Sequence, residues 1–126
     1  MRKLQIAVGE LVLEAELYEG PTARQVWAAL PIEGEVSTWG EEIYFTIPVV
    51  AGQEPGARAD VEVGELGYWP VGHAFCVFFG PTPVSRGGKP RAYSPVNILG
   101  RITSEVSLLK SLKTIRDGAV IRLTAE

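Results

Sequence analysis

The chain has 126 residues, of which 46% are hydrophobic and 21% are charged, and its formal net charge at pH 7 is -3. This length and composition are typical of one globular domain, which we expect to span residues 1–126. The negative net charge gives no reason to expect binding to nucleic acid or to an anionic membrane surface.

Three features bear on cellular location. The first ten residues, MRKLQIAVGE, alternate polar and apolar side chains instead of forming a continuous apolar core, so we expect no export signal. No apolar run approaches the ~18 residues that indicate a membrane-spanning helix. The single cysteine, Cys76, cannot form an internal disulfide, which agrees with a reducing compartment. The sequence therefore predicts a cytoplasmic protein.

Hydrophobic periodicity predicts a β-hairpin at the N-terminus, followed by a helix. Apolar residues alternate through residues 4–8 and again through 11–17, with Gly9-Glu10 as the turn between them. The helix is predicted to begin in PTARQ, with Thr22 and Gln25 forming a capping box, and to end at Pro31.

The rest of the chain predicts further strands, one long loop and a second helix. Strands are expected at residues 42–47, at two short segments joined at Gly64-Glu65, at 73–80, at 96–102 and at 119–126. The apolar segment HAFCVFFG is expected to be a central strand covered on both faces. GPTPVSRGGKPRAYSP, residues 80–95, has four prolines and three glycines and is expected to be a surface loop. The second helix is expected to be capped by Thr103 or Ser104 and to bury Leu108, Leu112 and Ile115.

These elements predict a mainly β protein. About eight strands and two helices in a chain of this size favour a closed eight-stranded antiparallel barrel, with the two helices capping its ends.

Three segments resemble the small cyclophilin-like proteins of bacteria and archaea, a family without a settled function. They are TWGEEIYF (38–45), GYWPVGHAFCVFFGPTP (67–83) and SPVNILGRI (94–102). The resemblance extends over nearly the whole chain and implies a single cyclophilin-like domain with the same barrel. A more distant resemblance is to the true cyclophilins, which are peptidyl-prolyl isomerases.

The distant resemblance also shows where this chain departs from the isomerases. Cyclophilins bind proline in an apolar pocket, with an arginine and a glutamine over the prolyl amide. By this resemblance Tyr44 stands at the glutamine, Glu42 at an apolar pocket position, and Phe75 or Cys76 at the pocket phenylalanine. Residues 25–57 contain no Lys or Arg, so the arginine has no counterpart there. Conventional isomerase activity is therefore not expected.

Aromatic side chains with few polar groups predict a groove for a small ligand or a peptide. The predicted ligand-binding residues are Trp39, Glu42, Tyr44, Tyr68, Trp69 and Phe79. Glu42 is also the candidate catalytic acid or base, without an assigned reaction. A structural interpretation stays open for several of them, since Trp39 could close one end of the barrel and Tyr68 or Trp69 could belong to the core.

Two functions compete on this basis. The preferred one is ligand binding without isomerase activity, and the alternative is a weak peptidyl-prolyl isomerase that takes its cation, Arg86 or Arg91, from the long loop. No metal site is expected, because His73 and Cys76 have no partner ligands and fall on opposite faces of a strand. The glycines form no phosphate-binding loop, no cofactor is expected, and the sequence indicates no particular oligomeric state.

Overall fold

The structure is a computed structural model that describes every residue from Met1 to Glu126. One antiparallel sheet runs in the order β3-β10-β1-β2-β9-β7-β8-β5-β4, and β6 pairs only with β9. The strands are β1 (Arg2–Val8), β2 (Leu11–Leu17), β3 (Ile32–Glu35), β4 (Ser37–Thr38), β5 (Glu42–Thr46), β6 (Arg58–Asp60), β7 (Glu65–Trp69), β8 (Ala74–Phe78), β9 (Arg91–Ile102) and β10 (Val120–Ala125).

The sheet curls on itself but is not closed. Its two end strands, β3 and β4, are consecutive in the chain and are separated only by Val36. The chain therefore connects the two ends of the sheet, while no ladder of backbone hydrogen bonds joins them. The predicted closed eight-stranded barrel is wrong on both counts, since the sheet is open and has ten strands. Residues 32–38 contain few apolar side chains, so periodicity gave no sign of the two short end strands.

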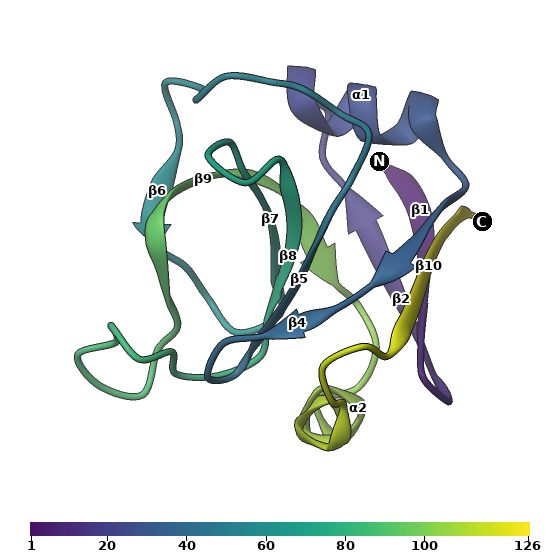
Figure 1. The fold of residues 1–126 in the computed structure, drawn as a ribbon. Coiled ribbons are helices and arrows are strands. Elements are labelled where there is room, and N and C mark those ends of the chain that lie inside the picture. The colour runs from purple at the N-terminus through teal and green to yellow at the C-terminus, as the bar shows by residue number, and fades with distance from the viewer.

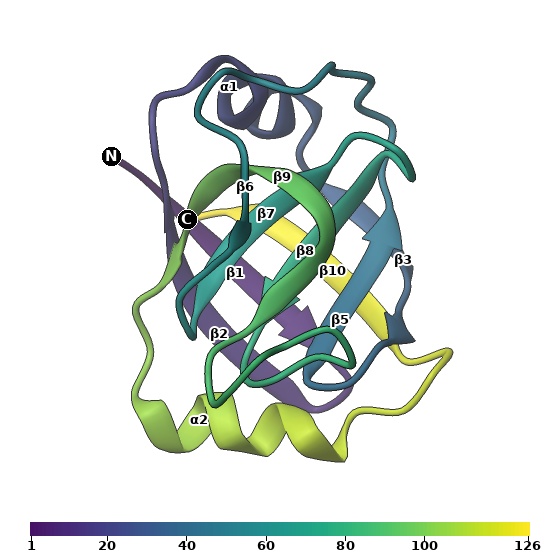
Figure 2. The same ribbon diagram turned by 90° about the vertical axis from the view of Figure 1, so that its left-hand side faces the viewer.

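Two helices lie at opposite ends of the curved sheet, as Figures 1 and 2 show. They are α1 (Pro21–Ala29) and α2 (Val106–Ser111), and α2 continues into a short 3-10 helix, η1 (Leu112–Thr114). None of these helices has the length and apolar character needed to cross a membrane. The mainly β composition with two helices is thus confirmed.

The helix caps differ from the predicted ones. Gly20 is the N-cap of α1 and Glu105 that of α2, and neither makes a side-chain capping bond. Thr22 is buried instead, and its hydroxyl donates to the carboxylate of Glu54. Ser104 Oγ accepts a hydrogen bond from the Glu14 N–H at 2.8 Å. Both predicted caps therefore stabilise distant segments rather than their own helices.

The curved sheet encloses a main core and carries a second apolar cluster on its outer face. Strand β8 contributes to both, because its side chains alternate: Phe75 and Val77 enter the main core, whereas Cys76 enters the second cluster. All five residues of β8 are buried, which confirms the prediction of a strand covered on both faces. The second cluster consists of Val61, Ala74, Cys76, Phe78, Ala92 and Val96.

The first half of β9 covers this second cluster. In Figure 2 this green strand passes in front of β7 and β8. The loop predicted at residues 80–95 therefore ends at Pro90, and the next five residues are strand. Pro95 is tolerated there because the pairing of β6 with β9 is irregular, with a register shift between Arg58 and Asp60. β9 can lie close to β7 because Gly67 of β7 has no side chain. A Cβ at this position would lie 2.9 Å from Val96 Cγ2.

Candidate ligand-binding site

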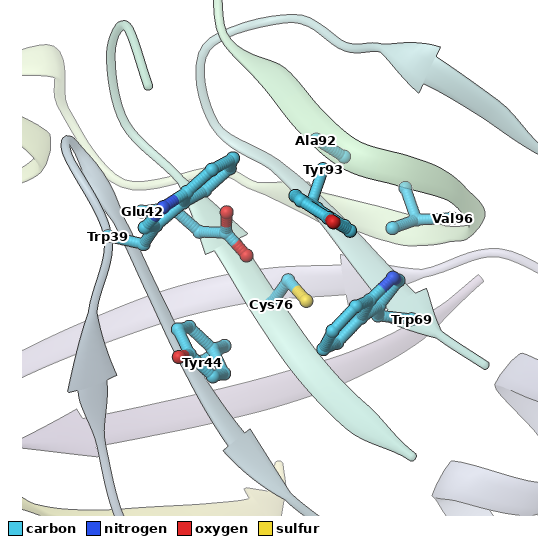
Figure 3. A pocket seen from close by; sticks show the side chains of 8 residues that line it. All are labelled: Trp39, Glu42, Tyr44, Trp69, Cys76, Ala92, Tyr93 and Val96. Atoms are coloured by element: carbon cyan, nitrogen blue, oxygen red, sulfur yellow. The ribbon is translucent and has the colours of Figure 1, made fainter. Parts of the chain in front are cut away.

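A pocket with a volume of about 220 Å³ opens on the outer face of the sheet, beside the second apolar cluster. Figure 3 shows its side chains converging from β5, β7, β8 and β9 and from the turn between β4 and β5. The lining residues are Trp39, Glu42, Tyr44, Trp69, Cys76, Ala92, Tyr93 and Val96. Seven of these eight are hydrophobic, and the eighth is the carboxylic acid Glu42.

Strand alternation positions the floor of this pocket. In β5, Ile43 and Phe45 face the main core, so Glu42 and Tyr44 face outward. Tyr44 lies directly opposite Cys76 of β8 in the antiparallel register. The choice between Phe75 and Cys76 that the sequence left open is thereby settled, because Cys76 lines the pocket.

A tight turn between β4 and β5 brings Trp39 to the same pocket. The Trp39 N–H donates to the Glu42 carbonyl at 2.9 Å, and Gly40 between them has a φ of 59°. A Cβ at Gly40 would lie 2.8 Å from both Pro83 Cδ and Thr82 Cα. The segment TWGEE therefore needs a glycine to place its tryptophan beside its second glutamate.

Three aromatic rings form a wall of steeply angled planes. The ring centroids of Trp39 and Tyr93 lie 6.0 Å apart at 72°, and those of Trp69 and Tyr93 lie 6.1 Å apart at 80°. The indole N–H of Trp69 donates to Ser94 Oγ at 2.6 Å, which fixes this ring against β9. Tyr93 is 72% exposed and forms the outer rim.

Glu42 is the polar group of the floor, and it is only 6% exposed. Burial raises its pKa from 4.5 to about 7, and a hydrogen bond with the Cys76 thiol limits this rise. None of the salt bridges of the chain includes Glu42. The carboxyl group can therefore exchange a proton near neutral pH.

Cys76 is held as a neutral thiol. Burial and the nearby Glu42 raise its pKa well above the ordinary value for a cysteine. Since the thiolate is the reactive form, this arrangement does not favour a nucleophilic role.

Four of the six predicted ligand-binding residues meet in this pocket: Trp39, Glu42, Tyr44 and Trp69. The other two lie elsewhere. Tyr68 is fully buried in the main core, where its hydroxyl donates to the Val49 carbonyl at 2.7 Å. Phe79 is also in the main core and lines a separate, more polar hollow near η1. Tyr68 alternates with Trp69 along β7, so only one of the pair can face outward.

The sequence prediction missed the part of the wall that β9 supplies. Ala92, Tyr93 and Val96 lie in or just after the segment expected to be a loop. The spacing of Ala92, Ser94 and Val96 was a strand signal, but the nearby prolines outweighed it.

No arginine or lysine lines the pocket. Arg91 forms a salt bridge with Asp60, with Nη1 and Oδ1 2.9 Å apart. Arg86 is exposed on the loop before β9 and takes part in no salt bridge. His73 is also exposed, and no three His, Cys, Asp or Glu side chains converge as metal ligands.

Comparison with known proteins agrees with this architecture. The sequence model of the family described as cyclophilin-like matches residues 2–124. The solution structure of a hypothetical protein from Archaeoglobus fulgidus is similar, with a TM-score of 0.81 and 37% identity, covering 99% of this chain and 95% of that one. No curated protein matches the sequence. The resemblance seen in the three sequence segments is confirmed: the chain belongs to the cyclophilin-like family.

Proposed function

We propose that this protein binds a small ligand, or one side chain of a peptide, in the pocket of Trp39, Glu42 and Trp69, without catalysing prolyl isomerisation. The observation that carries this proposal is the lining itself, with seven hydrophobic residues around a single buried carboxylic acid. Concave apolar sites with few polar groups are the usual form of a ligand pocket, because the apolar walls give affinity and the polar group gives orientation.

The size of the pocket restricts the ligand. Its volume of about 220 Å³ lies below the ~300–1,000 Å³ that is usual for sites of drug-sized molecules. A metabolite head group or a single amino-acid side chain therefore fits better than an extended molecule. The half-buried rings of Trp39 and Trp69 supply large contact areas that lose little conformational entropy on binding.

A screen for thermal stabilisation by metabolites and short peptides tests this proposal. A ligand that binds only the folded state raises its apparent stability by mass action. A hit is assigned to the pocket if it changes tryptophan fluorescence and if Trp39→Phe removes most of that change. Trp27→Phe is the matched control, because Trp27 lies on α1 and outside the pocket. Loss of the signal in Trp27→Phe alone would place the ligand elsewhere and contradict the proposal.

The alternative, a weak prolyl isomerase, needs a cation above the pocket. Arg86 is the loop arginine without a salt bridge and is the residue that this alternative would have to recruit. Its exposed position outside the pocket lining favours the ligand-binding function.

A further inference from the structure

We propose that the ligand of this pocket is an organic cation, an alkylated ammonium group held between the Glu42 carboxylate and the rings of Trp39, Trp69 and Tyr93. This inference rests on the proposed ligand-binding function and specifies the chemistry of the ligand.

The charge arrangement of the pocket is the first support. Glu42 has no cationic partner within the chain, although six salt bridges form elsewhere. Glu42 lines the pocket, and Figure 3 shows its carboxyl oxygens pointing into the space between the other lining side chains. Buried carboxylates in proteins are normally paired or hydrogen-bonded, so an unpaired one that faces a cavity is suited to a cation from outside.

The aromatic wall is the second and independent support. The faces of Trp and Tyr rings attract cations, and rings set at steep angles can surround one cation from several sides. Tyr93 meets Trp39 at 72° and Trp69 at 80°, and Figure 3 shows the three rings on different sides of the space in front of the Glu42 carboxyl group, which we call the aromatic box. The chain does not fill this box itself, since its one internal cation–π contact is Arg2 over Trp27.

The mainly apolar lining of the pocket favours alkylated over primary ammonium groups. A primary ammonium has three N–H donors that need acceptors when they are buried. The side-chain oxygen acceptors of the lining are the Glu42 carboxylate and the hydroxyls of Tyr44 and Tyr93. Ammonium groups with three or four alkyl substituents have one N–H or none, and their methyl groups pack well against apolar walls such as Ala92 and Val96.

A neutral isostere separates this inference from the proposal on which it rests. Choline and 3,3-dimethylbutan-1-ol have nearly the same shape, but only choline carries a charge. Titrations at pH 8 with calorimetry or NMR should give a dissociation constant at least about tenfold lower for choline. Equal binding of the two compounds would overturn the cation inference and leave the apolar pocket standing. Binding of neither would overturn the inference and would also count against the proposed pocket.

Two variants locate the effect. Glu42→Gln keeps the shape of the side chain but removes its charge, so it should weaken the binding of choline several-fold more than the binding of the alcohol. Tyr93→Leu should also weaken the binding of choline. We expect this variant to fold, because Tyr93 is 72% exposed. Glu41→Gln is the matched control, because Glu41 lies outside the pocket and pairs with Lys113 at 3.1 Å. Equal loss of choline binding in Glu41→Gln and Glu42→Gln would contradict the inference.

The pH dependence of choline affinity tests whether Glu42 contacts the ligand, because a merely structural Glu42 would not make choline binding depend on pH. The other titratable groups of the lining are Cys76 on β8, Tyr44 on β5 and Tyr93 on β9. Choline affinity should rise by up to about tenfold between pH 6 and 8, as Glu42 ionises, whereas that of the alcohol should not. A profile that is flat for choline would overturn the inference.

The same chemistry can come from a free metabolite or from a methylated lysine side chain. A capped tripeptide with a central trimethyllysine distinguishes the two sources. Binding equal to that of choline indicates a free small molecule, and binding at least about tenfold tighter indicates a peptide. Both results support the cation. Equal binding of the trimethyllysine peptide and of its norleucine counterpart would overturn it.

Discussion

Two buried glutamates of this protein have similar exposure but differ in the hydrogen bonds and ion pairs of their carboxyl groups. Glu65 is 9% exposed and Glu42 is 6% exposed. Glu65 receives two hydrogen bonds of 2.8 Å from the guanidinium of Arg58 and another of 2.8 Å from the Glu62 N–H. Glu42 takes part in no salt bridge, and its carboxyl group has a hydrogen bond with the Cys76 thiol.

This difference reverses the effect of burial on the two carboxyl groups. Burial by itself would raise the pKa of Glu65, but Arg58 and the Glu62 N–H lower it below its ordinary value. At Glu42 burial dominates, and the pKa reaches about 7. The fold supplies Glu65 with a cation and a backbone donor, whereas it leaves Glu42 in a pocket without a cationic partner, which is why we propose a functional role for Glu42 and not for Glu65.

The largest expected effect is a change in the pH dependence of stability in Glu42→Gln. Glu42 titrates near 4.5 when unfolded and near 7 when folded, so folding favours its protonated form. Its contribution is complete below pH 4.5 and is lost as pH rises through 7, by an amount of about 3 kcal/mol at most. Denaturant titrations from pH 5 to 8 should therefore show a fall in wild type that is weaker in the variant. Parallel profiles would show that Glu42 resembles Glu65 more than the structure indicates.

Removing the partner of Glu65 should have the next largest effect. Arg58→Ala leaves a buried carboxylate with one backbone donor, and we expect a loss of about 2–3 kcal/mol at pH 7, reduced by the partial exposure of Arg58. Chemical denaturation measures this loss. Arg91→Ala is the matched control, since Arg91 pairs with the exposed Asp60 and should cost about 1 kcal/mol or less. Similar losses in both variants would contradict the special role of Glu65 and Arg58.

The turn that covers Glu42 gives a smaller effect with two readouts. Gly40→Val forces a branched residue into a positive φ and against Thr82 and Pro83, so we expect a loss of about 1–3 kcal/mol. Displacement of Trp39 should also expose Glu42 and lower its pKa toward the ordinary value. Thermal melting and an NMR titration of the Glu42 carboxyl measure the two effects. A variant that melts within a degree of wild type would show that the glycine is incidental.

The sequence predicted the strands and the outward side of β5 better than it predicted the shape of the sheet. Alternation in a strand such as β5 reports which side chains share a face, so Glu42 and Tyr44 were placed together correctly. The pairing of distant strands is not encoded in local periodicity, and the end strands β3 and β4 were missed. Tyr93 was missed for a related reason, because the prolines around it suggested a loop while the packing of β9 over Gly67 made a strand.

The smallest expected effect is none at all: the protein should not accelerate prolyl isomerisation. Uncatalysed isomerisation takes ~10–100 s at 25 °C, so a proline-limited refolding assay detects even modest catalysis. No Lys or Arg lines the pocket, and the Glu42 carboxyl would meet an apolar proline ring, which requires either an unpaired buried charge or uptake of a proton.

The control for host isomerases is a double variant, Glu42→Ala with Tyr44→Ala, purified in the same way as wild type. If wild type accelerated refolding and this variant did not, the pocket would be an isomerase site. Arg86→Ala would then show whether the loop supplies the cation. In that case an arginine would approach Glu42 much as Arg58 approaches Glu65, and the contrast between the two carboxylates would disappear in the active state. A prolyl isomerase would need a cation above the pocket, and that cation would also form an ion pair with Glu42. Because Glu42 has no such partner, we expect no catalysis.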